Sequence, residues 1–473
     1  MSGEHLPMDR FADNAKAALQ NPVQRQALHK AAGLFRERRT GALQRADGFQ
    51  NWRDDARAIK DHTLLHLDRY LVQFEQNATA RGTVVHWACD GAEAARIVIE
   101  LCKKHSASLA VKSKSMTTEE ISLNDAMQKE GIGAVETDLG EWILQLAGET
   151  PFHIVVPAIH KTRAQVGEIL HGATGVDAAA SAEDLTKAAR KALRAEFLKA
   201  GVGISGANFA IAETGSILIL ENEGNARLCT TLPPVHIAIV GIEKAIPRLS
   251  DLPVFLRLLP RSGTGQDLTT YQSLLTGPRP DAIGEGPREL HVILMDNGRA
   301  RMLREEVTRQ SLACIRCGAC LNACPVYQQV GGHAYGSVYP GPIGAVITPQ
   351  LQDLHAAREL PFASSLCGAC RDVCPVKIDI PELLLHLRKN IKEGDAEHRP
   401  AARSRFEALA FSAWAFCMRG KRRYAFVTSV ARIADRLLGP LLRKLPPMSS
   451  WTKGRTAPRL AQKSFRASWK EGM

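Results

Sequence analysis

The sequence has no long apolar run. No stretch of its 473 residues approaches the roughly 20 apolar residues that a membrane-spanning helix requires. The first residues, MSGEHLPMDRFADNAKAALQ, also lack the apolar core and the small-residue cleavage site of a secretory signal. We therefore expect a cytoplasmic protein rather than a membrane-spanning or secreted one.

Familiar nucleotide-binding signatures are missing as well. We identify no GxGxxG fingerprint, which argues against a Rossmann site for a nicotinamide or FAD. The segment SGTGQ (262–266) is rich in glycine but lacks the GK[ST] ending of a P-loop. The chain also has no recognisable helix-turn-helix or other reader, so the sequence disfavours nucleic acid as a partner.

Cysteine is sparse outside one segment. Seven of the 11 cysteines lie between Cys314 and Cys374, and the other four are scattered. A disulfide scaffold distributes cysteines through a small secreted chain, whereas dense short spacings in a large chain indicate metal binding.

The positive charge is concentrated at the C-terminal end. Residues 396–473 contain 17 Lys or Arg and four Asp or Glu, against a net charge of +12 for the whole chain. Such a tail could meet an acidic redox partner or anionic lipid at the inner face of the membrane, or it could be an ordinary solvated surface. These alternatives stay open.

Hydrophobic spacing divides the chain into four predicted parts. Residues 1–80 have helical spacing, with a helix start at Asn21-Pro22. Residues 81–300 alternate strands and helices, which is typical of an α/β domain with a largely parallel sheet. Residues 301–395 hold the cysteine motifs between helices, and residues 396–473 form a basic helical C-terminal region.

Within the α/β part, short apolar runs predict strands and periodic runs predict helices. A tight turn at Gly215 joins two of the strands, so part of the sheet is expected to be antiparallel. Strands are predicted at 83–88, 108–113, 133–138, 152–158, 208–214, 216–222, 235–241 and 289–296. Helices are predicted at 92–105, 117–130, 141–148 and 182–200, and two amphipathic helices at 405–416 and 424–438. The helix at 117–130 is expected to begin with a Thr-x-x-Glu cap at Thr117.

The first cysteine motif reads C-I-R-C-G-A-C-L-N-A-C-P over residues 314–325. The spacing C-x₂-C-x₂-C-x₃-C-P is the bacterial ferredoxin signature, whose fourth cysteine ligates the other of two clusters. Backbone N–H groups of such loops can donate to cluster sulfurs. Zinc sites usually use two separated C-x₂-C pairs, so the triple spacing favours iron–sulfur over zinc.

The second motif, C-G-A-C-R-D-V-C-P at 367–375, aligns with the last nine positions of the first. Crossed ligation then assigns Cys314, Cys317, Cys320 and Cys374 to cluster one. It leaves cluster two with Cys324, Cys367 and Cys370, because Ser364 stands where a fourth cysteine is expected.

Three explanations of this gap stay open. The second cluster could be a [3Fe–4S] cluster, or a [4Fe–4S] cluster ligated by Ser364 or water. A distant thiol such as Cys417 could also supply the fourth bond. The roughly forty residues between the motifs indicate a helical ferredoxin module with a long insertion rather than a compact ferredoxin repeat.

The α/β part offers weaker candidates. Lys112 and Lys114 lie at a strand-to-helix turn. Backbone N–H groups at that helix start could bind an anion, or the turn could be an ordinary helix cap with solvated lysines. Glu213 and Arg227, near predicted strand ends, could bind a small hydroxy- or keto-acid, or could be turn chemistry and a surface ion pair. His86, His153, His160 and His236 lie in or beside apolar strands and are interpreted as core residues, not metal ligands. No catalytic residue is identified.

Together these segments resemble the L-lactate utilisation protein B family, the YkgF-type iron–sulfur proteins. The resemblance spans nearly the whole chain. It is carried by VVHWACDGAEA, VKSKSMTTEEI, GISGANFAIAETGSI, ENEGNARLCTTLPPVHI, CIRCGACLNACPVY, GGHAYGSVYPGPIGAVITP and SSLCGACRDVCPVKIDIP.

The resemblance implies an α/β domain similar in fold to the sugar-phosphate isomerase and CoA-transferase group, and two [4Fe–4S] clusters. It also implies a multi-component system that oxidises L-lactate to pyruvate, with a cysteine-rich iron–sulfur protein and a smaller homologue of the α/β domain as partners. This chain would be the electron-transfer subunit. The alternative is an isomerase- or transferase-like enzyme with structural or regulatory clusters.

Overall fold

The computed structural model describes residues 6–279, 286–395, 398, 405–446, 449, 452, 455–457 and 459–470. The chain divides into two compact units, Met1–Arg399 and Pro400–Met473, and each is considered by itself. None of the described helices is long and apolar enough to cross a membrane.

The N-terminal segment is helical, as its spacing predicts. The predicted start at Asn21-Pro22 is confirmed, because the Asn21 side chain accepts the N–H of Gln24 at 3.0 Å and proline occupies the first helical position. The helices are η1 (Met8–Arg10), α1 (Phe11–Leu19), α2 (Pro22–Gln44), α3 (Phe49–Leu65) and α4 (Leu67–Thr79).

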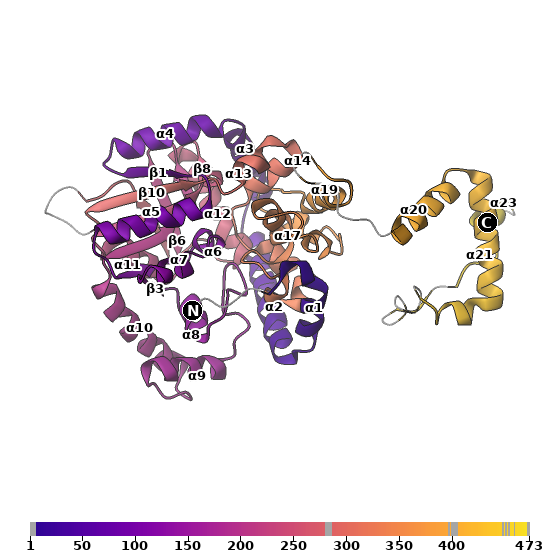
Figure 1. Cartoon of the computed structure of the whole chain (residues 1–473), viewed down its shortest axis with the longest axis horizontal. Helices are drawn as coiled ribbons and strands as arrows, with labels where there is room; N and C mark the ends of the chain where they lie inside the picture. The colour runs from indigo at the N-terminus through magenta and orange to yellow at the C-terminus, as the bar shows by residue number, and fades with distance from the viewer. Residues whose placement is uncertain are drawn as a thin grey trace. The chain divides into compact units, whose positions relative to one another are not determined.

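A six-stranded parallel sheet forms the centre of the α/β part (Figure 1). Its order is β1-β10-β7-β4-β2-β3, and every neighbouring pair is parallel. The strands are β1 (Val84–Ala88), β2 (Leu109–Lys112), β3 (Gly133–Glu136), β4 (Val202–Gly206), β7 (Val235–Gly241) and β10 (Glu289–Met295). A parallel sheet requires crossover connections, which the alternating helices provide.

Helices cover both faces of this sheet. On one face Val98 and Met127 pack against Ile204 and Ile237 in an apolar core. On the other face Trp142 and Phe197 belong to a second core. The helices are α5 (Gly91–Lys104), α6 (Met116–Glu120), α7 (Leu123–Lys129), α8 (Leu139–Ala147), α9 (Arg163–Thr174), α10 (Ala182–Lys199), α11 (Asn225–Thr231) and α12 (Leu252–Gly263), with η2 (Ile242–Lys244) and η3 (Leu249–Asp251).

A second, four-stranded sheet has the order β8-β5-β6-β9. The predicted antiparallel pair is confirmed, since β5 and β6 pair antiparallel on either side of Gly215. Gly215 has φ +63°, and a Cβ there would lie 2.2 Å from the backbone nitrogen of Ala78, so only glycine fits. The strands are β5 (Phe209–Ile211), β6 (Ser216–Glu221), β8 (Ala245–Ile246) and β9 (Tyr271–Leu275).

Three local predictions are wrong. Residues 152–158 form no strand, because the ring Nδ1 of His153 accepts the N–H groups of Val155 and Val156 and turns the chain. The helix predicted at 117–130 is broken into α6 and α7 by Ser122, whose φ is +50°. Ser115, not Thr117, caps its start.

A GxGxxG spacing does occur at 201–206. It lies almost entirely inside strand β4 rather than in a turn between a strand and a helix. The segment therefore does not form the dinucleotide-binding loop of a Rossmann fold.

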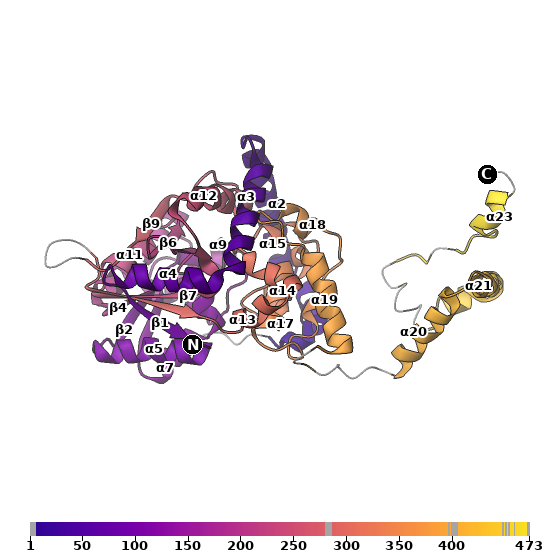
Figure 2. The ribbon, with the colours of Figure 1, turned by 90° about the horizontal axis from the view of Figure 1, so that it is seen from above.

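The cysteine motifs lie in a module of short helices that packs against the N-terminal helices and the α/β part (Figure 2). Its elements are α13 (Arg299–Arg304), α14 (Glu306–Arg309), η4 (Gln310–Ala313), α15 (Ala319–Ala323), α16 (Tyr327–Val330), η5 (His333–Tyr335), α17 (Gly341–Leu351), η6 (Leu360–Phe362), α18 (Ala369–Val373) and α19 (Ile380–Glu393).

The second unit is helical over its described residues. Both amphipathic helices predicted there are confirmed, as parts of α20 (Arg405–Met418) and α21 (Lys421–Leu442). A short helix, α23 (Phe465–Lys470), follows. A mixed α/β part, a helical cysteine module and a helical C-terminal region thus agree with the broad fold class expected from the sequence.

Candidate metal centre and adjoining cavity

The two cysteine loops share one backbone conformation. Gly318 and Gly368, at matching positions, have φ +76° and +85°, and each immediately precedes a short helix, α15 or α18. Arg316 and Leu366, also at matching positions, have φ +60° and +54°. Two segments that share positive φ angles at two matching positions form a structural repeat, as their alignment predicts.

The structure brings Cys314, Cys317, Cys320 and Cys374 together around one small cavity. Ile154, Ile343 and Ile378 supply part of its apolar wall. Burial, then the neighbouring charges of Cys314, Cys317 and Cys374, raises the pKa of Cys320 well above its usual value. Four thiols held this close in an apolar site favour a cationic centre that would bind them as thiolates.

The remaining three cysteines of the motifs form a second group. Burial, and then the charges of Cys324 and Cys367, together raise the pKa of Cys370 to about 12. Cys367 is exposed, and its pKa is lowered, first by the N–H of Ala369 and then by the Ser365 hydroxyl. The second group therefore reaches the molecular surface, whereas the first is largely enclosed.

Backbone N–H groups point at these sulfurs. Cys314 Sγ accepts the N–H of Arg316 at 3.4 Å, and Cys374 Sγ accepts that of Ile378 at 3.3 Å. At the position that matches Cys314, the Ser364 hydroxyl accepts the N–H of Leu366 at 3.1 Å. The Ser364 hydroxyl therefore makes the hydrogen bond that the Cys314 thiol makes in the first loop, so an oxygen lies where a sulfur is expected.

None of the 11 cysteines is in a disulfide. Cys102 and Cys229 are buried in the α/β part, where burial raises the pKa of each thiol. Cys417 lies on α20 in the second unit.

Arginine from the N-terminal helices holds the second loop in place. Arg53 of α3 donates from Nε to the Cys374 carbonyl at 2.9 Å and from Nη2 to the Asp372 carbonyl at 3.0 Å. Arg57, one turn later, donates to the Lys377 carbonyl at 3.1 Å. The N-terminal segment is thus part of the support of the cysteine module, a role that its sequence did not signal.

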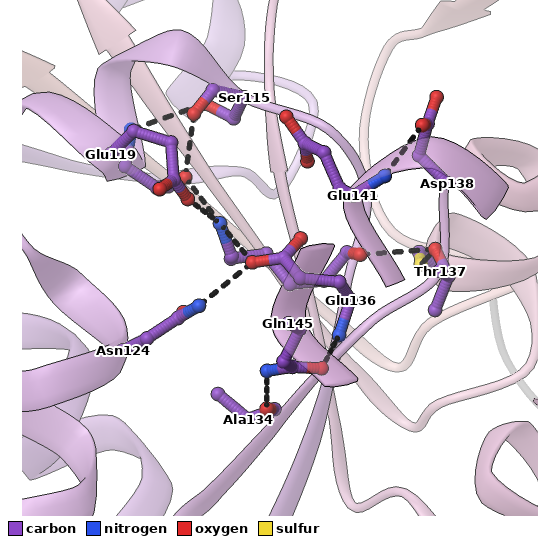
Figure 3. Close-up of polar contacts among 12 residues, drawn as sticks. Ser115, Glu119, Asn124, Ala134, Glu136, Thr137, Asp138, Glu141 and Gln145 are labelled. Atoms are coloured by element: carbon purple, nitrogen blue, oxygen red, sulfur yellow. Dashed lines mark hydrogen bonds and ion pairs between the residues drawn. The ribbon is translucent and has the colours of Figure 1, made fainter. Parts of the chain in front are cut away.

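Lys112 is not a solvated lysine, so that interpretation of it is wrong. Its ammonium is buried between the carboxylates of Glu119 and Glu136, at 2.6 and 2.7 Å. Burial lowers the pKa of Lys112, but these carboxylates outweigh burial and leave it raised. Figure 3 shows the same cluster, in which Asn124 donates to Glu136 at 2.7 Å.

Glu141 completes this cluster of charges. Burial and the charge of Glu136 raise its pKa well above the usual range for a carboxyl group. Lys114, two residues after Lys112, instead donates to the Val155 carbonyl at 2.9 Å and lines a cavity.

Glu213 and Arg227 are not brought together into an acid-binding pair. Glu213 accepts the N–H of Leu249 at 2.8 Å, and Arg227 is an exposed residue of α11 whose N–H is accepted by Glu221. These contacts are the turn and cap chemistry that was the alternative for this pair.

The four histidines have partners within the protein. His236 lies in central strand β7 and contacts the Ser205 hydroxyl at 2.8 Å, while His86 contacts His291 at 3.0 Å. His153 contacts Asn322 at 3.2 Å, and His160 contacts Glu149 at 2.9 Å.

A cavity of about 380 Å³, which no sequence pattern indicates, lies between the α/β part and the first cysteine loop. It lies where β2, β4 and β7 end, and Arg316 and Cys317 form part of its wall. Lys244 also lines it. These side chains come from segments far apart in the chain, so only the folded structure shows that they meet.

Three family models match the chain in order. The LUD domain matches residues 71–295, a 4Fe-4S dicluster domain matches residues 310–378, and the model named lactate utilisation protein B, C-terminal, matches residues 386–473. The dicluster match spans all seven clustered cysteines and supports an iron–sulfur cofactor.

Similar proteins extend over nearly the full length. Lactate utilization protein B of Shouchella clausii is 43% identical, covering 98% of each chain. The Escherichia coli protein called uncharacterized electron transport protein YkgF is 40% identical, covering 98% of this chain and 96% of its own. Lactate utilization protein B of an Exiguobacterium species is 46% identical over 81% of this chain and 82% of its own. The chain therefore belongs to the lactate utilisation protein B family.

Proposed function

We propose that this chain is an iron–sulfur electron-transfer subunit of a system that oxidises L-lactate to pyruvate. The observation that carries the proposal is the sorting of the seven cysteines into two groups, each drawing on both loops. This is the crossed pattern that two neighbouring cubane clusters require. The family relationship supplies the connection to lactate.

Cys314, Cys317, Cys320 and Cys374 would hold one [4Fe–4S] cluster, and Cys324, Cys367 and Cys370 the second. When bound, such clusters supply one-electron transfer. Cys317 faces the cavity and Cys367 faces the surface, so the two groups of thiols lie between a buried pocket and an exposed edge.

Ser364 is our preferred candidate for the fourth position at the second cluster. The support is its hydroxyl, which makes the hydrogen bond that Cys314 makes in the first loop. A [3Fe–4S] cluster, a water ligand or Cys417 remain the competing explanations.

We keep the division into 1–80, 81–300, 301–395 and 396–473 as a proposal, together with a likeness of the α/β part to the isomerase and CoA-transferase group. A cysteine-rich iron–sulfur protein and a smaller α/β homologue are the proposed partners. The exposed apolar and basic side chains of α20 and α21 offer a surface for an acidic partner or for the inner face of the membrane.

The test is anaerobic purification of the co-expressed components, with iron and sulfide counting, EPR and lactate-dependent reduction. Cys317→Ala should lose the first cluster and its visible absorbance while the α/β part stays folded. Cys89→Ala, which removes an exposed cysteine outside the motifs, is the control and should change neither.

Full iron content in Cys317→Ala would contradict the ligand assignment. A colourless, sulfide-free wild-type protein after oxygen-free reconstitution would overturn the iron–sulfur proposal itself. Clusters that form normally but are never reduced by lactate with all components present would favour the isomerase- or transferase-like alternative.

A further inference from the structure

The cavity beside Cys317 lies where an α/β protein is expected to bind a ligand. Parallel β2, β4 and β7 all end at its edge, and open α/β sheets bind ligands outside the carboxyl ends of their strands. Its far wall is the first cysteine loop. A molecule in this cavity would therefore contact both the α/β part and the group of thiols proposed to hold the first cluster.

Two cations at this wall lack sufficient acceptors. Lys244, in η2 just after β7, donates no hydrogen bond to any residue that the structure describes. Nε and Nη1 of Arg316 are buried without a hydrogen-bond partner among the described residues, and its side chain is only 10% exposed. Its guanidinium also lies over the Tyr339 ring, 5.0 Å from the ring centroid, and beside the Cys314 thiol, so neither neighbour supplies a second carboxylate. Burial, and then the charge of Arg316, lowers the pKa of Lys244 to about 8.

The nearby carboxylate does not satisfy this pair. Glu243 Oε1 is 3.5 Å from Arg316 Nη2, but its other oxygen is bound to Arg299 Nε at 2.5 Å. Two adjacent cations that share one engaged carboxylate leave a site where a further anion would be stabilised.

The rest of the wall limits the charge of that anion. Glu221 and Glu223 also line the cavity, so a dianion or polyanion would be repelled there. The Ser113 hydroxyl is buried without a partner among the described residues, and Asn208 and Lys114 add further polar groups. A small monoanion that also carries a hydroxyl or carbonyl oxygen matches this arrangement.

We propose that the cavity binds a small 2-hydroxy- or 2-oxo-monocarboxylate, with Lys244 and Arg316 holding its carboxylate next to Cys317. This inference rests on the proposed function, and it places the substrate on this chain rather than on a partner. Arg316 links the two sites, since it lies between Cys314 and Cys317 and faces the cavity.

The test is anaerobic titration calorimetry of the full, cluster-loaded chain with oxamate, an inert analogue of pyruvate, and with L-lactate. Wild type should bind both, and Lys244→Met should weaken binding by tenfold or more. Lys244→Arg should restore most of it. Lys187→Met, which removes a 75% exposed lysine on α10, should bind as wild type does.

Oxamate should also shift the EPR signal of the cluster at Cys317 and leave that of the other cluster unchanged. Lys114→Met provides a second variant on a different part of the wall, away from the cysteines, and should weaken binding as well. Iron content measured in every variant separates loss of binding from loss of clusters.

Undetectable binding of either compound to wild type, or equal binding by Lys244→Met with its clusters intact, would overturn the inference. In that case lactate-dependent reduction of the co-expressed system would still support the proposed function and place lactate on a partner. Absence of iron from wild type would instead remove the proposed function.

Discussion

Ser364 makes the two cysteine loops differ by a single atom at one position. Its hydroxyl takes the place of a thiol, yet oxygen binds iron less readily than sulfur does, as cluster-binding loops show by their use of cysteine. The second group is also the one with an exposed cysteine, Cys367. Both features would make the proposed second cluster the more labile of the two.

We expect Ser364→Cys to slow the loss of iron from the second cluster severalfold, because a fourth thiolate would complete its ligands. The measurement is iron content and EPR during timed exposure to air. Ser108→Cys, at an exposed serine of the α/β part, is the control and should not protect. Equal protection by both variants would mean that any added thiol suffices and that position 364 is not special.

His236 should make stability depend on pH. Burial lowers its pKa to about 3, so the folded protein keeps the ring neutral while the unfolded chain protonates it below about pH 6.5. Stability is therefore fully present above pH 6.5 and is lost as the pH falls toward 3, by about 1.4 kcal/mol per pH unit for this group.

His236→Gln should flatten this dependence between about pH 6.5 and pH 5. Urea unfolding followed by circular dichroism measures it. His171→Gln changes an exposed histidine and should retain the slope of wild type. An unchanged slope in His236→Gln would assign the acid sensitivity to other groups.

Helix α3 stabilises the second cysteine loop through hydrogen bonds. Arg53 is 9% exposed and donates to two carbonyls of that loop. Removal of this charged donor leaves the two carbonyl oxygens without their hydrogen bonds. The free energy of unfolding should fall by roughly 1.5–3 kcal/mol per hydrogen bond lost.

Arg53→Met should therefore lower the melting temperature and speed the loss of iron. Thermal unfolding and iron counting after dialysis check both. The exposed Arg69 of α4 supplies the matched variant Arg69→Met, which should behave as wild type. Iron retention that is unaffected in Arg53→Met would show that the loop holds its shape without α3.

Local pattern sufficed for most elements and for the closeness of Cys374 to the first cysteine loop. Strands such as β7 and β10 are short apolar runs, and the crossed grouping follows from two aligned motifs. Strand β4 was missed, because VGISG has two glycines and only two large apolar residues. The burial of Lys112 was missed because Glu136, one of its partners, lies on a different element.

The cavity could not be predicted from the sequence either, because the residues that line it lie on different elements. Lys244 and Arg316 are separated by α12, β9 and β10 in the chain, and no spacing rule relates them. The two residues lie close together only because of long-range packing in the folded chain.

The second unit should be separable from the first. Each unit is compact by itself, and α20 exposes Phe406, Leu409 and Trp414 at 77%, 70% and 60%. Large exposed apolar side chains beside many basic residues are typical of a surface that binds a partner.

A chain ending at Arg399 should keep its iron and its melting temperature within about 3 °C. It should lose lactate-dependent reduction in the co-expressed system. Calorimetry and the reduction assay test these two expectations. Loss of iron on truncation would show instead that the second unit, with Cys417, supports a cluster.

The crossed grouping of the cysteines also sets an order for biogenesis. Cys374 joins three residues of the first loop, so neither centre is complete while the ribosome is still making the second loop. With the proposed ligands, cofactor insertion would then wait until translation has passed both motifs, and it should be nearly all-or-none. A nascent chain stalled between residues 324 and 367 would accept no stable cluster from the assembly machinery.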